Sequence, residues 1–133
     1  RHSTHYRLLA HINEVAEAGL MLADFAYSHW PDEWTKKLDR QELLQILLLH
    51  DLDKYLLLSD ESLEMSIAHG TLSAMILNDL GFDSRVIEAV ASHSPSASLH
   101  LDDPASMILH YCDLFSCDHI YMLVSRTPHY CMK

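Results

Sequence analysis

The chain has 133 residues, of which 49% are hydrophobic, and a formal net charge of −10 from 9 basic and 19 acidic side chains. This size fits one domain over residues 1–133, and the charge argues against broad binding to duplex nucleic acid or to anionic lipid. No uncharged apolar run approaches the ~18 residues that a membrane span needs. Three cysteines without CxxC spacing are typical of a reducing compartment. We therefore expect a cytoplasmic domain. The start at Arg1 instead of Met leaves open that an upstream segment has been removed.

The first half of the chain predicts two helices with a polar break between them. Apolar residues recur at helical spacing over about 4–27, which predicts the first helix. The break contains Trp30 and Trp34, which we expect to cover one end of a helical bundle; the alternative is that they line a pocket and stack on a nucleobase. The second helix begins near Asp39, a typical N-cap residue. Because it is apolar nearly all round, it is predicted to be the central, buried helix.

Three further helices are predicted in the second half. The third runs from about residue 59 or 60 to Gly81, because glycine commonly follows the last residue of a helix. The fourth covers about 83–93, and a loop over 94–103 follows it. The fifth begins after Asp103 as N-cap, with Pro104 at the first helical position, and continues to about Phe115. The predicted fold class is all-α, a compact bundle of five or more helices.

The sequence LLLHDLDKY places His50 and Asp51 at the end of the most hydrophobic helix, after six apolar residues in seven. A buried aspartate is costly unless it is paired or binds a metal, and a neutral histidine beside it offers a ring nitrogen. An isolated His-Asp pair is usually a surface or capping pair, but this apolar setting favours a metal-binding site. Lys54 is on the same helical face as His50, within reach of a phosphate oxygen or of Asp51.

Other residues of ligand type lie on the predicted inner sides of the remaining helices. These are His11, His69, His93 and Asp113. Each of them alone is more typical of a satisfied core or surface residue than of a metal ligand. Together they give every helix one titratable residue on its inner side, and a core of this size rarely tolerates that without something to coordinate.

The order of His11, the pair His50-Asp51, and Asp113 resembles the H…HD…D signature of the HD superfamily of metal-dependent phosphohydrolases. The segment HINEVAEAGLMLA resembles the first helix of the family, HDLDK its central motif, and ILHYCDLF the helix with the last aspartate. The resemblance extends over about residues 11–118. It implies that these four residues bind one divalent ion and that a water activated by the ion hydrolyses a phosphate ester.

The resemblance also assigns roles to residues around these four. His69 and His93 resemble the extra histidines of family members that bind two metals or a phosphate. They are expected to hold a second ion with Asp51 as bridge, or else to hydrogen-bond the phosphate or protonate the leaving oxygen. Lys54 would stabilise charge on the phosphoryl oxygens, while Arg85 either assists or is a solvated surface residue.

Three departures from the family pattern bear on the assignment. Asp53 stands where the central motif commonly has glycine, and this leaves open whether its carboxylate approaches the metal or faces solvent. The GYP signature is absent and His93 is followed by Ser94 instead of another histidine, which argues against the subfamily that hydrolyses cyclic di-GMP.

The expected cofactor is a divalent ion, because two imidazoles and two carboxylates suit Mn²⁺, Fe²⁺, Co²⁺, Ni²⁺ or Zn²⁺, with Mg²⁺ as an alternative. One ion is expected, and two are left open. The expected partner is a small phosphorylated substrate such as a nucleotide, without membrane or extended duplex nucleic acid, and a homodimer is left open. Two other functions compete: a diiron oxygenase of the same fold, and a regulatory module in which the metal only senses or stabilises.

Overall fold

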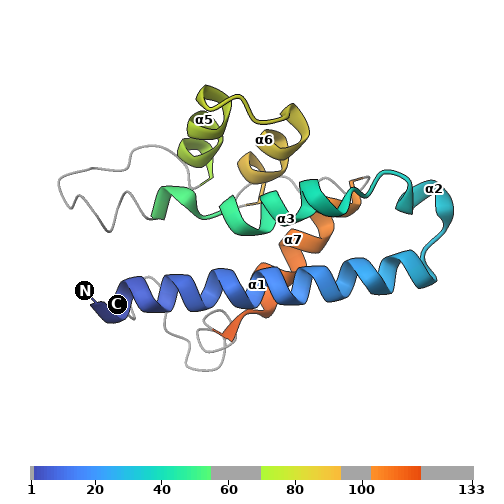
Figure 1. Ribbon diagram of the computed structural model, residues 1–133, viewed down its shortest axis with the longest axis horizontal. Helices are drawn as coiled ribbons and strands as arrows, with labels where there is room; N and C mark the ends of the chain where they lie inside the picture. The colour runs from blue at the N-terminus through green and yellow to red at the C-terminus, as the bar shows by residue number, and fades with distance from the viewer. Residues whose placement is uncertain (1, 55–69, 94–102, 118–133) are drawn as a thin grey trace.

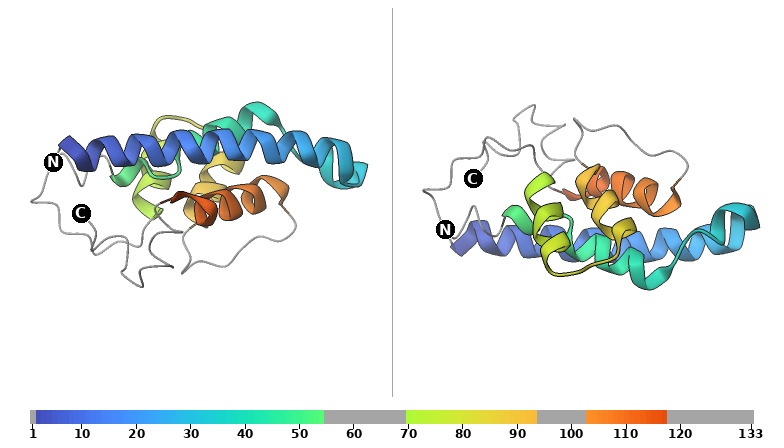
Figure 2. Two further views of the ribbon diagram at one scale, coloured as in Figure 1. Left: turned by 90° about the horizontal axis from the view of Figure 1, so that it is seen from below. Right: turned by 90° about the horizontal axis from the view of Figure 1, so that it is seen from above.

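The computed structural model describes residues 2–54, 70–93 and 103–117, with helices α1 (His2–His29), α2 (Asp32–Thr35), α3 (Arg40–Leu49), α5 (Thr71–Asp79), α6 (Ser84–Ala91) and α7 (Pro104–Phe115). Helix α1 extends along one side of the domain, and α3 returns beside it (Figure 1). Helices α5 and α6 pair on the other side of α3, and α7 packs against α1 and α3 (Figure 2). The described residues contain no strand, so the predicted all-α class is confirmed.

Helix α3 is the element that joins the two sides of the domain. Asp39 caps it as predicted, because its side chain accepts a hydrogen bond from Glu42 N at 2.9 Å. Its buried residues, Leu43, Ile46 and Leu47, face the core formed with α1 and α6. The prediction of a central, buried helix holds for one face only, because Leu44 and Leu48 are 37% and 41% exposed. Its neighbours α1, α6 and α7 cover one stripe of the helix and not its whole circumference.

Helices α1 and α3 approach each other closely at Gly19. A Cβ atom at this position would lie 2.5 Å from Leu47 Cδ1, so only a hydrogen fits between the two helices. His11 lies about two turns before Gly19, and His50 lies one turn after Leu47. The close approach therefore brings the histidine of α1 beside the end of α3.

The predicted helix over about 59–81 is not continuous. Gly70 has φ 94°, which is incompatible with a right-handed helix, and α5 begins only at the next residue, Thr71. The predicted helix start near residue 59 lies outside the described residues. The predicted end is confirmed, because α5 closes at Leu80 and Gly81 follows with φ 82°.

Helix α6 begins at Ser84, in agreement with the predicted start at about residue 83, and α7 begins after its predicted N-cap, Asp103. Asp83 accepts a hydrogen bond from Arg85 N at 2.9 Å, and Asp103 accepts one from Ala105 N at 3.3 Å. Pro104 is the first residue of α7, as predicted. Helix α6 ends at Ala91, so that His93 follows the helix; the predicted loop after it lies outside the described residues except for Asp103.

The segment between α1 and α3 contains a short helix that was not predicted, α2. Trp30 packs against the hydrophobic core and meets Trp34 edge to face, with ring centroids 6.0 Å apart. Trp30 follows His11 by nineteen residues along one helix, which corresponds to roughly 28 Å. The tryptophans therefore cover the far end of the bundle, and the alternative that they stack on a substrate at the histidine cluster was wrong. No helix in the described ranges is long and apolar enough to cross a membrane.

Candidate metal centre

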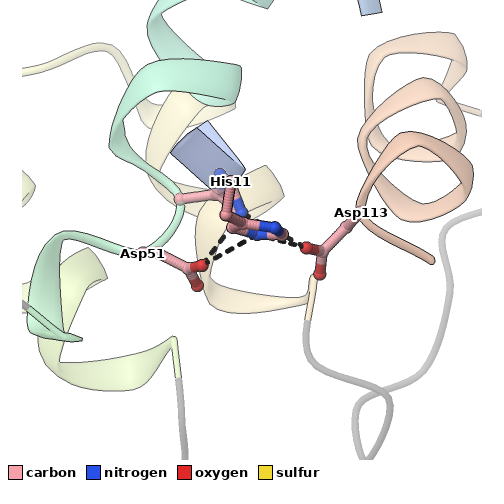
Figure 3. A group of neighbouring side chains, drawn as sticks. His11, Asp51 and Asp113 are labelled. Atoms are coloured by element: carbon pink, nitrogen blue, oxygen red, sulfur yellow. Dashed lines mark ion pairs between the residues drawn. The ribbon is translucent and has the colours of Figure 1, made fainter. Parts of the chain in front are cut away.

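Four residues from three helices converge in the interior of the domain. His11 comes from α1, His50 and Asp51 from the end of α3, and Asp113 from α7. All four are buried, and one nitrogen or oxygen atom from each lies within 4.8 Å of the others. Figure 3 shows His11 between Asp51 and Asp113. The structure thus brings together the four residues predicted as metal ligands.

The two imidazoles and the two carboxylates alternate around a common centre. His11 Nε2 lies 3.3 Å from Asp51 Oδ2 and 3.0 Å from Asp113 Oδ1 (Figure 3). His50 Nε2 lies 3.3 Å and 3.5 Å from the same two oxygens. Each nitrogen therefore contacts both carboxylates, so the four groups face one point from different directions.

The end of α3 fixes the orientation of the His50 ring. Its Nδ1 lies 2.8 Å from the carbonyl oxygen of Leu47, one turn earlier. A carbonyl oxygen can only accept, so Nδ1 donates the hydrogen and Nε2 faces the two carboxylates. Ligating histidines commonly donate their second ring nitrogen in this way, because the bond fixes both the tautomer and the ring plane.

The carboxylates raise the proton affinity of both histidines. Burial lowers the pKa of His50, but the charge of Asp51 and the contacts with Asp113 outweigh it and raise the pKa to about 10. The pKa of His11 is also raised, because contacts with Asp113 and Asp51 outweigh burial. For Asp113 burial raises the pKa, but the two histidines outweigh it and lower the pKa well below its usual range. Without a metal ion, the protons on the histidines therefore compensate the buried carboxylates.

The donor set fits a divalent ion. Two imidazole nitrogens and two carboxylate oxygens are the ligands that divalent transition metals accept, and a cation would replace the protons that the metal-free cluster carries. The ligand atoms are shielded from solvent and gathered within 4.8 Å. This buried group of histidines and aspartates could therefore hold a metal ion.

Two further predicted residues lie around Asp51. Lys54 Nζ is 3.2 Å from Asp51 Oδ2, and its side chain is 28% exposed, so its amine reaches from the surface to the site. His93 Nε2 is 3.5 Å from the other oxygen, Oδ1, and its ring meets that of His50 edge to face at 5.1 Å. Its Nδ1 lies 2.5 Å from the carbonyl oxygen of Val90, which orients Nε2 toward Asp51.

Two other residues were considered at this site from the sequence, His69 and Arg85. His69 lies outside the described residues. Arg85 is at the opposite end of α3, where its guanidinium donates to the carbonyl oxygen of Lys37 and lies 3.6 Å from Glu42 Oε2. The structure thus supports the surface alternative for Arg85 and not a role at the metal centre.

Asp53 is the residue near the centre whose role the sequence left open. Its side chain does not face solvent: it is fully buried, and Oδ2 accepts a hydrogen bond from Gly70 N at 3.2 Å. Its own N–H donates to Ser73 Oγ at 2.7 Å. The signal in the sequence is an aspartate two residues after the His-Asp pair, but its partners lie 17 and 20 residues later, beyond any local pattern.

Fold and site together define an all-α domain with a buried histidine and aspartate centre of metal-binding type. The model of the HD domain family matches residues 8–118, well over half of the chain. The chain therefore belongs to the HD domain family, as the resemblance predicted. Neither a curated protein nor a solved structure matches it.

Proposed function

We propose that this protein is a metal-dependent phosphohydrolase that acts on a nucleotide or another small phosphate ester. The observation that carries the proposal is the convergence of His11, His50, Asp51 and Asp113 within 4.8 Å, beside a lysine that reaches the same centre. An ion held by these four residues would supply Lewis acidity, which activates water and withdraws charge from a phosphoryl oxygen.

The other residues around Asp51 supply the groups that a phosphoryl substrate needs. Lys54 brings a positive charge to the solvent side of the centre, where it can bind a phosphoryl oxygen and stabilise the charge that develops there. His93 presents Nε2 on the opposite side of the Asp51 carboxylate, where it can hydrogen-bond the phosphate or give a proton to the leaving oxygen. We assign the same chemistry to His69 as an alternative or additional donor.

The net charge of −10 favours a small substrate over a long nucleic acid, because the protein repels an extended polyanion except where a cation reverses the local field. We propose one domain over residues 1–133 and a cytoplasmic location, consistent with cysteines that lack any disulfide pattern. A homodimer stays an open alternative.

The experiment starts with the untagged protein, purified without added metal and examined by elemental analysis. About one equivalent of a transition metal, together with release of phosphate or alcohol from a panel of nucleotides and nitrophenyl mono- and diesters, supports the proposal. For proteins in which one of the four ligand residues is substituted, Arg85→Ala is the matched control. The charge of Arg85 lies beside the other end of α3. Retained metal without turnover on any ester would favour a sensing or structural role for the site.

One observation favours a second candidate, an HD-fold diiron oxygenase. Asp51 offers Oδ2 to His11 and His50 but Oδ1 to His93, and a carboxylate with partners on both oxygens is suited to bridge two ions. Close to two equivalents of iron and consumption of oxygen with an organic substrate would favour this candidate over hydrolysis. Two equivalents of iron together with ester hydrolysis would instead support a phosphohydrolase with two metal ions.

A further inference from the structure

The buried carboxylate of Asp53 joins the helical segment after the His-Asp pair to the start of α5. Oδ2 accepts from Gly70 N at 3.2 Å, and the backbone N–H of Asp53 donates to Ser73 Oγ at 2.7 Å. Both Asp53 and Ser73 are fully buried. A buried carboxylate is costly unless its oxygens are bonded, which favours the hydrogen bond from Gly70 N. Together with the bond from the Asp53 backbone to Ser73, it holds the segment around Asp53 and the start of α5 in one relative position.

Gly70 in turn lies directly against the end of α6. A Cβ atom on Gly70 would be 2.9 Å from the carbonyl oxygen of Val90 and 3.3 Å from that of Ala91. It would also lie 3.3 Å from Cε1 of the His93 ring. The backbone of Gly70 is therefore in close contact with this turn and with the His93 imidazole, and a shift of Gly70 changes the space in which that ring lies.

His93 in turn contacts Asp51. Its Nδ1 contacts the carbonyl oxygen of Val90 at 2.5 Å, and its Nε2 lies 3.5 Å from Asp51 Oδ1. Asp51 and Asp53 are next-nearest neighbours in the chain. The segment that contains Asp51 and Asp53 is therefore linked to His93 in two ways. Asp51 contacts the His93 ring directly, and Asp53 is bonded to Gly70, which in turn lies against that ring. Helices α5 and α6, which carry this second connection, lie side by side (Figure 2).

We propose that Asp53 is a positioning residue that sets the distance between the His93 ring and the Asp51 carboxylate through the backbone of Gly70. The chemical role of His93 rests on the proposed function, whereas the orientation of its ring does not. Removal of the Asp53 carboxylate releases Gly70 N, and the turn before α5 moves relative to α6. His93 then loses its fixed place beside Asp51 Oδ1, while the four ligand residues keep their own side chains.

The test is nuclear magnetic resonance of the metal-free full chain with ¹⁵N-labelled histidine, which reports the ring nitrogens of His93 without any turnover. The His93 signals are assigned by their loss in His93→Gln. Asp53→Ala is expected to shift or broaden them, whereas Asp53→Asn, whose side-chain oxygen still accepts from Gly70, is expected to keep them near the wild-type positions.

Val86→Ala is the matched control for a loss of stability alone. Val86 is fully buried in the first half of α6, so the cavity left by its truncation lowers the melting temperature, whereas the atoms nearest a Cβ on Gly70 belong to the later residues Val90, Ala91 and His93. His93 signals that stay unchanged in Asp53→Ala, or that move as far in Val86→Ala, would overturn the proposal. If Asp53→Ala does not fold, Ser73→Ala is used instead, and it is expected to move the same signals by less; no movement would count against the proposal.

A second measurement separates this inference from the proposed function. If the loaded protein hydrolyses an ester, Asp53→Ala should add less than about a twofold loss of kcat on a His93→Ala background, because both substitutions then remove the same contribution. If the losses of kcat from the two substitutions add fully in the double variant, positioning through His93 is contradicted. If no ester is hydrolysed, the proposed function fails, and the histidine spectra still decide whether Asp53 positions His93.

Discussion

His93 and Asp51 meet at a carboxylate oxygen different from the one that the other neighbours approach: His93 Nε2 lies 3.5 Å from Asp51 Oδ1, whereas His11, His50 and Lys54 approach Oδ2. One carboxylate therefore serves two groups of residues. Among the described residues, the imidazoles of His11 and His50 lie at Oδ2, and the imidazole of His93, which follows α6, lies at Oδ1. Asp51 is for this reason the residue whose loss should have the widest effect.

Asp51→Ala is expected to abolish metal retention and hydrolysis together. Removal of an outer partner of a ligand typically weakens a metal site by about 10–100-fold, so loss of a ligand contacted by four side chains should weaken it by at least about a hundredfold. Elemental analysis after dialysis measures the metal, and circular dichroism checks the fold. Asp24→Ala is the control, because Asp24 is an exposed carboxylate paired with Arg40 on the surface. A folded Asp51→Ala protein with wild-type metal content would disprove the assigned centre.

The stability of the metal-free protein should decrease as the pH rises above neutrality. The pKa of His50 is raised from 6.5 to about 10, so its stabilising contribution is complete below about pH 6.5 and is lost as the pH rises toward 10. Asp113 acts in the opposite sense: its pKa is lowered from 3.8, so its contribution is present above that pH and is lost on acidification. Urea unfolding between pH 4 and 10 should show the largest free energy of unfolding at about pH 4–6.5.

Saturation with metal should reverse the pH dependence of stability above neutrality, so that the free energy of unfolding rises with pH. Metal binding requires neutral imidazoles, so it releases protons from His11 and His50 and becomes stronger as the pH rises. Titration calorimetry in two buffers with different ionisation enthalpies measures the protons released. Equal stability at pH 6 and pH 9 in the metal-free protein, without proton release on loading, would contradict the protonated cluster.

Lys54→Met should lower kcat more than it changes metal content. The amine lies 3.2 Å from Asp51 Oδ2 but is 28% exposed, so its loss leaves the four buried ligands in place while it removes the positive charge on the solvent side. Loss of one group that stabilises transition-state charge typically costs about 10²–10³-fold in kcat. Steady-state kinetics on the best ester measures the effect, with Lys36→Met at the other end of α3 as control. An equal loss of metal and kcat would instead make Lys54 a structural partner of Asp51.

Gly19→Ala should lower the metal affinity of the centre, although Gly19 is not one of the ligands. The new Cβ would lie 2.5 Å and 2.7 Å from the two Cδ atoms of Leu47, so α1 and α3 must separate or Leu47 must change rotamer, at a cost of about 1–3 kcal/mol. Because His11 and His50 lie on these two helices, metal affinity should fall as well. Gly81→Ala is the control: its φ of 82° strains an alanine, but nothing lies near its Cβ. Both variants should melt earlier, and only Gly19→Ala should bind metal more weakly.

Local chemistry was enough to predict the class of fold and the ends of several helices from the sequence. Asp39 and Asp103 cap helices as predicted, and Asp83 caps α6 at its predicted start, because a side-chain oxygen bonds a backbone N–H two or three residues away. The helix predicted across Gly70 failed, because a single glycine in a helical pattern does not reveal its φ angle. The short helix α2 was missed for a similar reason, since four residues are too few for a periodic signal.

The sequence by itself determined which residues could form the centre, because a histidine and an aspartate after six apolar residues, with further histidines and an aspartate on other apolar faces, have few other uses in a core. Only the tertiary structure decided which of them meet. It placed Arg85 and the tryptophans away from the centre and turned Asp53 toward Gly70. The physical reason is that contacts between helices depend on how closely each pair packs, and this spacing is set where residues distant from each other in the sequence meet, such as Gly19 and Leu47.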